Sequence, residues 1–261
     1  MANFHAVRLC AVGTESQMQS MLANMLINVG YKDKEIPASI EKKLLKIKKH
    51  VKSDKYDYSL NMINPETDTQ LMSAYTFLEI VKNKNGLYSA LFRHEEAWNF
   101  NYDNFKYLHN QSQRIPMYAI HADESYDRGC GSIDIENGEI NEDYDDMYTA
   151  FFFLQIGFDY FYEDDYFDED EESAQEEISD FKEYVVENIG EDGWEEVIED
   201  LRFNLENAIK NKLHTQSETE KMTARELEQE MFDTAQIILW GDKRAKDYLK
   251  QLNRILKYLE M

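Results

Sequence analysis

The chain contains few residues of the kinds that cross-link or sharply bend a fold: two cysteines, three prolines and ten glycines among 261 residues. Cys10 and Cys130 lie far apart and belong to no C-x-x-C pair, which argues against a disulfide framework or a zinc ribbon. Scarce proline and glycine are typical of proteins with substantial helix and few sharp turns. The composition therefore favours a helix-rich or α+β protein.

Long apolar runs and targeting signals are also missing. No stretch approaches the roughly 18 uncharged apolar residues of a membrane-spanning helix. The N-terminus lacks the basic region and apolar run of a signal peptide. We therefore expect a cytoplasmic protein with no membrane partner. Hydrophobic residues make up 43% and aromatic residues 13% of the chain, which argues against wholesale disorder.

Basic residues are nearly missing from residues 134–200. This stretch holds 27 of the 52 acidic residues and one base, Lys182, so its formal charge is −26 while the whole chain carries −24. The rest of the chain is nearly neutral. A concentrated negative field favours cationic partners and repels nucleic acid and anionic membranes. We expect a basic protein surface as the partner, and no direct binding to nucleic acid.

The N-terminal half mixes strand and helix patterns. Residues 4–12 predict a strand that ends at Gly13-Thr14, and apolar residues at helical spacing over residues 18–29 predict the helix that follows. Asn85-Gly86 lies between two β-prone runs and predicts a hairpin. The remaining predicted features are a helix over residues 37–52 with a basic face, a helix over residues 102–111, paired strands at residues 116–121 and 133–135, and a turn at Asn137-Gly138.

From residue 145 the apolar period is helical. Two apolar stripes, over residues 174–189 and 194–209, flank a break at Gly190 and Gly193. Ser217-x-x-Glu220 and Thr223-x-x-Glu226 both match the capping-box pattern that marks a helix start. A further stripe over residues 248–259 predicts the last helix. We expect an α+β domain over residues 1–140 and an acidic α-helical domain, a helical bundle, over residues 141–261.

Three stretches resemble the YubB-type ferredoxin-like proteins of plasmids and phages. They are residues 1–13, which read Met-Ala-Asn-Phe-His-Ala-Val-Arg-Leu-Cys-Ala-Val-Gly; the isolated Trp98 before a helix; and residues 116–125, which read Pro-Met-Tyr-Ala-Ile-His-Ala-Asp-Glu-Ser and precede Gly129-Cys-Gly131 and Asn137-Gly138. The resemblance covers at most the first 140 residues. It implies a ferredoxin-like sheet and a mobile-element origin, and it brings no catalytic residues with it.

The density of charge in residues 134–200 is close to that of a nucleic-acid strand. With 27 acids in 67 residues, a helix would carry one charge per ~3.7 Å of its axis, and one strand of duplex DNA carries one per ~3.4 Å. Such a surface can occupy a basic nucleic-acid channel in place of the nucleic acid. The alternative is that the acids form only the solvated sides of amphipathic helices and one acidic loop.

Aromatic residues interleave with this charge. Phe151, Leu154 and Phe158 fall at helical spacing and are expected in the core. Tyr160, Tyr162, Tyr166 and Phe167 lie among too many charges to be buried together, and aromatic residues are enriched at interface hot spots. The predicted partner-binding residues are Asp159, Tyr160, Tyr162, Glu163, Asp164, Asp165, Tyr166, Phe167, Asp168, Glu169, Asp170, Glu171 and Glu172.

Signals for metal binding and catalysis are weak. The aspartates near residue 165 can attract Ca²⁺ or Mg²⁺ weakly, but residues 134–146 fail the EF-hand spacing, and we expect no metal site. No nucleophile elbow, P-loop, dinucleotide-binding loop or His-Glu-x-x-His is present, and we expect no cofactor. His121-x-Asp123 can supply a general base and its orienting carboxylate. A histidine that serves only packing is the simpler interpretation of that pair.

The leading hypothesis is a non-enzymatic acidic inhibitor or adaptor that binds the basic groove of a nucleic-acid-handling protein. Antagonism of a defence nuclease by a phage or plasmid protein is its natural setting. The second hypothesis is a hydrolase or nucleotide-processing enzyme that uses His121 and Asp123. The third is a structural module in which the aromatic residues pack against a second copy of the chain.

Overall fold

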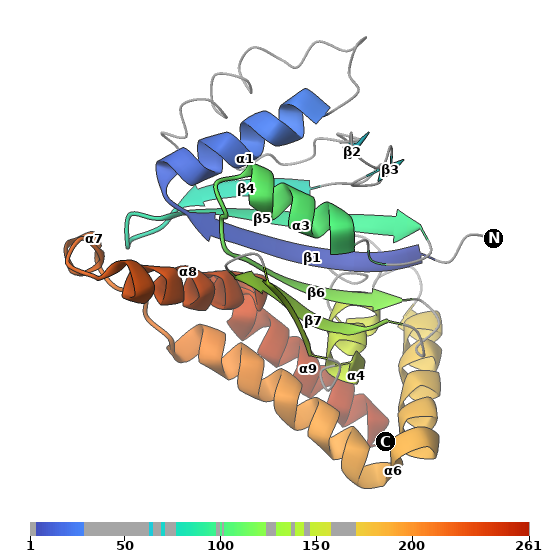
Figure 1. Cartoon of the computed structure of the whole chain (residues 1–261). Coiled ribbons are helices and arrows are strands. Elements are labelled where there is room, and N and C mark those ends of the chain that lie inside the picture. Colours follow the sequence, from blue (N-terminus) through green and yellow to red (C-terminus); the bar gives the residue numbers. More distant parts are fainter. Residues whose placement is uncertain are drawn as a thin grey trace.

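A six-stranded sheet with helices on both faces forms the centre of the molecule (Figure 1). The computed structural model describes residues 4–28, 63–64, 69–70, 77–97, 100, 102–123, 129–136, 139–143, 147–157 and 171–260. Every pair of neighbouring strands in the sheet is antiparallel. In spatial order the strands are β4 Phe77–Lys82, β5 Tyr88–Ala97, β1 Phe4–Gly13, β6 Met117–Asp123, β7 Gly131–Glu136 and β8 Glu139–Asp143. Two short strands, β2 Ile63–Asn64 and β3 Thr69–Gln70, form a separate pair.

Strand β1 lies inside the sheet and is buried on both faces. Successive side chains of a strand point to opposite faces. Val7 and Leu9 accordingly join one buried cluster, whereas Cys10 and Val12 join the other. A strand covered on both faces needs consecutive apolar residues. This explains why the opening of the chain reads as a nearly continuous apolar run.

The N-terminal helices cover one face of the sheet. Helix α1, Glu15–Asn28, and helix α3, Tyr102–Gln111, lie on the same side of it (Figure 1). Met18 and Met21 of α1 and Phe105 and Leu108 of α3 pack with the sheet in one cluster. In each helix the two residues are three positions apart, which places them on one side of the helix, facing the core.

The C-terminal helices cover the opposite face. They are α4 Met147–Phe151, the π-helical turn η1 Phe152–Gly157, α6 Glu171–Lys210, α7 Gln216–Thr219, α8 Ala224–Leu239, the 3-10 turn η2 Asp242–Arg244 and α9 Ala245–Leu259. Phe153, Phe181, Trp194 and Tyr248 share one buried cluster with the sheet residues on that face. The predicted boundary at residue 140 falls within β8, and the division into two domains stays a prediction.

Most predicted elements are confirmed, and one predicted cap is wrong. The opening strand and helix, the hairpin around Asn85, helix 102–111 and the pairing of β6 with β7 all occur. Thr223 and Glu226 form the predicted capping box of α8. Ser217 caps nothing, because α7 begins one residue before it and Thr215 forms the capping box with Glu218 instead. The predicted helix over residues 37–52 lies outside the described residues.

Within the described part of the chain, no helix is both long enough and apolar enough to cross a membrane.

Candidate functional site

The predicted partner-binding residues fall almost entirely outside the described part of the chain. Asp159, Tyr160, Tyr162 and residues 163–170 lie in the range 158–170, which is not described. Glu171 and Glu172 are the first two residues of α6. The interface role of these residues therefore stays a prediction. The described continuation of the acidic stretch is α6 itself.

Helix α6 displays a continuous series of exposed carboxylates. We call this set the acidic surface of α6, and its ten members, all exposed, are Glu176, Glu177, Asp180, Glu183, Glu187, Glu191, Asp192, Glu195, Glu196 and Glu199. The opposite side of the helix is apolar, with Phe181 and Leu201 fully buried. The helix is thus amphipathic, and over residues 176–199 its solvent side carries ten acids and no exposed base.

A glycine divides α6 into two segments. Gly190 has φ 84° and ψ 174°, a conformation that is essentially restricted to glycine. The two segments meet at an angle near this point (Figure 1). Buried residues continue on both sides of the bend, with Ile178 and Val185 before it and Val197 and Leu201 after it. The acidic surface therefore follows the outer sides of two helical segments.

The acidic surface contains little internal neutralisation. The one base of residues 134–200, Lys182, is half-buried, and its Nζ lies 5.8 Å from the centroid of the Trp194 ring. Burial, and to a smaller extent the neighbouring Asp180 carboxylate, raise the pKa of Glu177 above its ordinary value. Burial is therefore the main cause of this raised pKa, and the like charge of Asp180 adds to it.

The end of α6 differs from the acidic surface. Glu206 forms an ion pair with Lys210 one turn later, at 2.5 Å, and Arg202 is half-buried. Phe203 is 64% exposed, and it is the most exposed of the large hydrophobic side chains that the structure describes. An aromatic ring therefore stands on the solvent side of α6 just beyond the last exposed glutamate.

A second cluster contains both residues of the predicted catalytic pair. His5 of β1 lies directly opposite Asp123 of β6, and His121 lies two residues further along β6. His5 Nε2 is 2.8 Å from His121 Nδ1, and His5 Nδ1 is 3.7 Å from Asp123 Oδ2. The contacts thus run from Asp123 through His5 to His121. His5 was missed because its partners lie more than 110 residues away; only the pairing of β1 with β6 could have indicated it.

This histidine cluster is enclosed by the fold. His5, His121 and Asp123 are each about 1% exposed, and the Phe100 ring stacks on His121 with a centroid distance of 5.1 Å. Burial and the adjacent His5 lower the pKa of His121 to about 3, although a backbone hydrogen bond with Gly129 acts in the opposite direction. An imidazole with a pKa near 3 is neutral at pH 7 but is a weak base, whereas an efficient general base has a pKa near the working pH. The same burial denies a substrate direct access to it.

Cys130 is packed beside this cluster and shows no sign of reactivity. The backbone N–H of Asp123 donates to Cys130 Sγ at 3.2 Å, and the cysteine is fully buried. A reactive cysteine needs an electropositive, partly exposed setting. Cys10 is also buried and unbridged.

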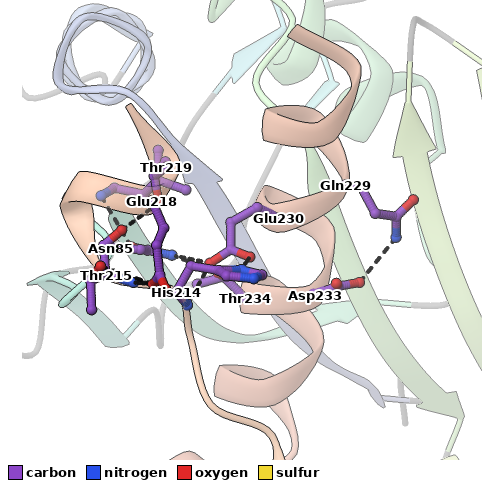
Figure 2. A network of polar contacts seen from close by, with 10 residues as sticks. Asn85, His214, Thr215, Glu218, Thr219, Gln229, Glu230, Asp233 and Thr234 are labelled. Carbon is purple, nitrogen blue, oxygen red and sulfur yellow. Dashed lines mark hydrogen bonds and ion pairs between the residues drawn. The ribbon is translucent and has the colours of Figure 1, made fainter. Parts of the chain in front are cut away.

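A third polar network joins the hairpin between β4 and β5 to α8 (Figure 2). Asn85 Nδ2 donates to Glu230 Oε1 at 2.9 Å and to Thr234 Oγ1 at 3.1 Å. His214 Nδ1 lies 2.6 Å from Glu230 Oε2, and its backbone N–H donates to Glu230 Oε1 at 3.3 Å. Sequence reasoning missed this network too, because no local pattern links residue 85 to residue 230.

The described ranges contain no group of three or more His, Cys, Asp or Glu side chains arranged to hold a metal ion. The aspartates near residue 165 that were considered for Ca²⁺ or Mg²⁺ lie outside those ranges.

Comparison with known proteins found no match among protein-family models, curated proteins or solved structures.

Proposed function

We propose that the protein is a non-enzymatic inhibitor or adaptor that binds a basic groove of a nucleic-acid-handling protein. The acidic surface of α6 and the thirteen predicted partner-binding residues between Asp159 and Glu172 would form the contact. One observation carries the proposal: ten exposed carboxylates line one helix, and the single base of the acidic stretch is half-buried against Trp194. Carboxylates arranged in this way attract cationic surfaces and repel nucleic acid itself.

The charge spacing supports a nucleic-acid substitute. The acidic surface spans residues 176–199, so its ten charges occupy 24 residues. At about 1.5 Å per residue this is roughly one charge per 3.6 Å of helix, close to the ~3.4 Å of a DNA strand. A groove that binds a phosphate backbone can therefore meet carboxylates at a similar density.

The cost of this charge to the fold supports a role outside folding. Like charges four residues apart on a helix, such as Glu195 and Glu199, destabilise it by about 0.2–0.5 kcal/mol per pair. Acids in the first turn of a helix are favourable, which accounts for Glu191 and Asp192 after the bend. No such benefit applies to Glu183 and Glu187, which precede the bend. A solvent face needs no such excess of acids, because α9 carries four bases and one acid.

The topology of the N-terminal part of the sheet is also part of the proposal. We also propose that the protein works in the reducing cytosol. We propose a ferredoxin-like arrangement for residues 4–123. It is supported by the chain order β1, α1, β4, β5, α3, β6, by the antiparallel spatial order β4-β5-β1-β6 and by the position of α1 and α3 on one face. The YubB-type resemblance suggests the setting of a phage or plasmid protein that acts against a host defence.

Capture of partners with matched variants tests the proposal. The α6-neutral variant carries Glu183→Gln, Glu187→Gln, Glu195→Gln and Glu199→Gln, all on exposed positions. The control variant neutralises four exposed acids outside the acidic stretch: Glu220, Asp233, Asp247 and Glu260. A basic nucleic-acid-binding protein should be captured at low salt by wild type and control and lost with the α6-neutral variant. Equal capture by all three would overturn the role of α6.

A parallel variant tests the residues that are predicted from sequence alone. Neutralisation of Asp164, Asp165, Asp168, Glu169, Asp170, Glu171 and Glu172 should weaken the same salt-sensitive binding. Unchanged affinity at low salt would remove that segment from the interface while leaving the role of α6 open to its own test.

The hydrolase hypothesis retains one observation in its favour, which is the run of contacts from Asp123 through His5 to His121. An activity found by substrate screening should disappear in a His121→Ala variant that still folds. Full activity in that variant would exclude these residues.

A further inference from the structure

The turn between β4 and β5 is shaped and docked by one side chain. Asn85 is 1% exposed, and its Oδ1 accepts from the backbone N–H of Leu87 at 3.1 Å. Its Nδ2 donates to Glu230 and Thr234 of α8. Gly86 follows with φ 84°, as the tight turn requires. Because Asn85 bonds both its own turn and α8, the shape of the turn is coupled to its attachment.

Glu230 is the centre of this attachment. The residue is 5% exposed, and its Oε1 accepts from the side chain of Asn85 and from the backbone of His214. Its Oε2 lies 2.6 Å from His214 Nδ1. A buried carboxylate with no counter-charge is costly. The counter-charge at this site comes from His214, whose side chain is 53% exposed and therefore exchanges protons with solvent.

The groups around His214 all favour its charged form. The hydrogen bond that His214 donates to Glu230 and the negative charge of Glu230, followed by smaller contributions from Glu218 of α7 and Asp233 of α8, raise the pKa of His214 above its ordinary value. The hairpin faces this pair with the uncharged Asn85. The Glu218 carboxylate is itself held by Thr215, whose N–H donates to it at 2.6 Å (Figure 2).

We propose that His214, Glu230 and Asn85 form a pH-sensitive clasp that holds the β4–β5 turn against α8. At low pH the protonated His214 neutralises the buried carboxylate, and the clasp is tight. When His214 loses its proton, Nδ1 can still donate a hydrogen bond, but the carboxylate keeps its charge without a counter-ion. The attachment of the turn then weakens. The contribution of the His214–Glu230 ion pair to this attachment is fully present below the ordinary histidine pKa of about 6.5. It is lost as the pH rises through the raised pKa of His214.

Hydrogen exchange at the Leu87 amide reports the opening of the turn directly, because this N–H is bonded to Asn85 Oδ1. Rates are corrected for the intrinsic pH dependence of exchange. In wild type, protection should fall several-fold between pH 5.5 and pH 8.5. His214→Arg, which keeps a positive charge throughout, should stay protected across this range. His214→Gln, which is never charged, should show weak protection throughout.

A wild-type protection profile parallel to that of His214→Gln would overturn the clasp. A second variant, Glu230→Gln, removes the buried charge, so the pH dependence should disappear even though His214 still titrates. Persistence of the full pH dependence in Glu230→Gln would also overturn it. Amides of residues 121–123, at the end of β6 that lies opposite the turn along the sheet, serve as the reference for global unfolding in every sample.

Discussion

The burial of one residue, His121, should make the stability of the folded protein sensitive to acid. Its pKa is lowered to about 3 by burial and by His5, so the folded state keeps it neutral. Between about pH 6.5 and pH 3 the unfolded chain binds a proton at this residue that the folded protein does not bind. Stability is therefore complete above pH 6.5 and falls as the pH decreases.

The acid sensitivity can be measured by urea unfolding at pH 7 and pH 4.5. The wild type should lose roughly 2.5–3 kcal/mol more than a His121→Asn variant, because each of the two pH units below 6.5 is equivalent to about 1.4 kcal/mol. Carboxyl groups titrate in both proteins, so only the difference between them reports His121. Equal losses in the two proteins would show that His121 is not kept neutral by the fold.

Phe203 allows a separate test of the acidic surface at the scale of one residue. The side chain is 64% exposed and follows Glu199 by one turn of α6. Helical side chains lean toward the N-terminus, so the ring extends over the turn that carries Glu199 and Asp200. Exposed aromatic residues are often the main contacts of an interface.

A Phe203→Ser variant should keep the urea midpoint of the wild type and lose at least ten-fold in affinity for the captured partner, the size of an interface hot spot. Tyr258→Ser is the matched control, since Tyr258 is an exposed aromatic residue of α9 that lies outside the acidic surface. Unchanged affinity would place the interface away from this end of α6.

At the scale of elements, the bend in α6 depends on one backbone conformation. A Cβ at Gly190 would meet no atom within 4 Å, so the cost of adding one is confined to the backbone. Gly190→Ala should destabilise the protein by about 1–3 kcal/mol, measured as a lower urea midpoint. Ser179→Ala, at an exposed position of the same helix, is the control. An unchanged urea midpoint in Gly190→Ala would mean that the fold does not require the bend.

The repulsion among the carboxylates of the acidic surface should also lower the stability of the folded protein. The α6-neutral variant removes like-charge pairs such as Glu195 with Glu199, each worth about 0.2–0.5 kcal/mol. Its urea midpoint should exceed that of the wild type at low salt, and the gain should shrink at high salt, where charges are screened. A variant less stable than wild type would indicate that these acids serve the fold.

The elements were largely predictable from sequence, whereas the polar clusters were not. Apolar spacing and turn residues act locally, so β1, α3, the hairpin around Asn85 and the break at Gly190 follow from short patterns. The contacts of His5 with His121 and of Asn85 with Glu230 depend on which strands and helices become neighbours. That choice is made by packing across the whole chain, and no local pattern records it.

At the scale of the molecule, one layer of helices on each side buries the inner strands β1 and β6, whereas the edge strand β8 stays exposed. The charge then concentrates on the outer side of the C-terminal layer, where α6 runs along the edge of the molecule (Figure 1). The hydrophobic core and the acidic surface therefore lie on different sides of α6. Substitution of exposed acids should therefore alter binding while the fold persists.

Competition with nucleic acid tests the central proposal most directly. The captured basic protein is bound first to a labelled DNA duplex, and the purified chain is then added at low salt. The wild type and the control variant should displace the duplex in a dose-dependent manner, and the α6-neutral variant should not. Simultaneous binding of the duplex and the wild-type chain, or equal displacement by the α6-neutral variant, would contradict a nucleic-acid substitute built on α6.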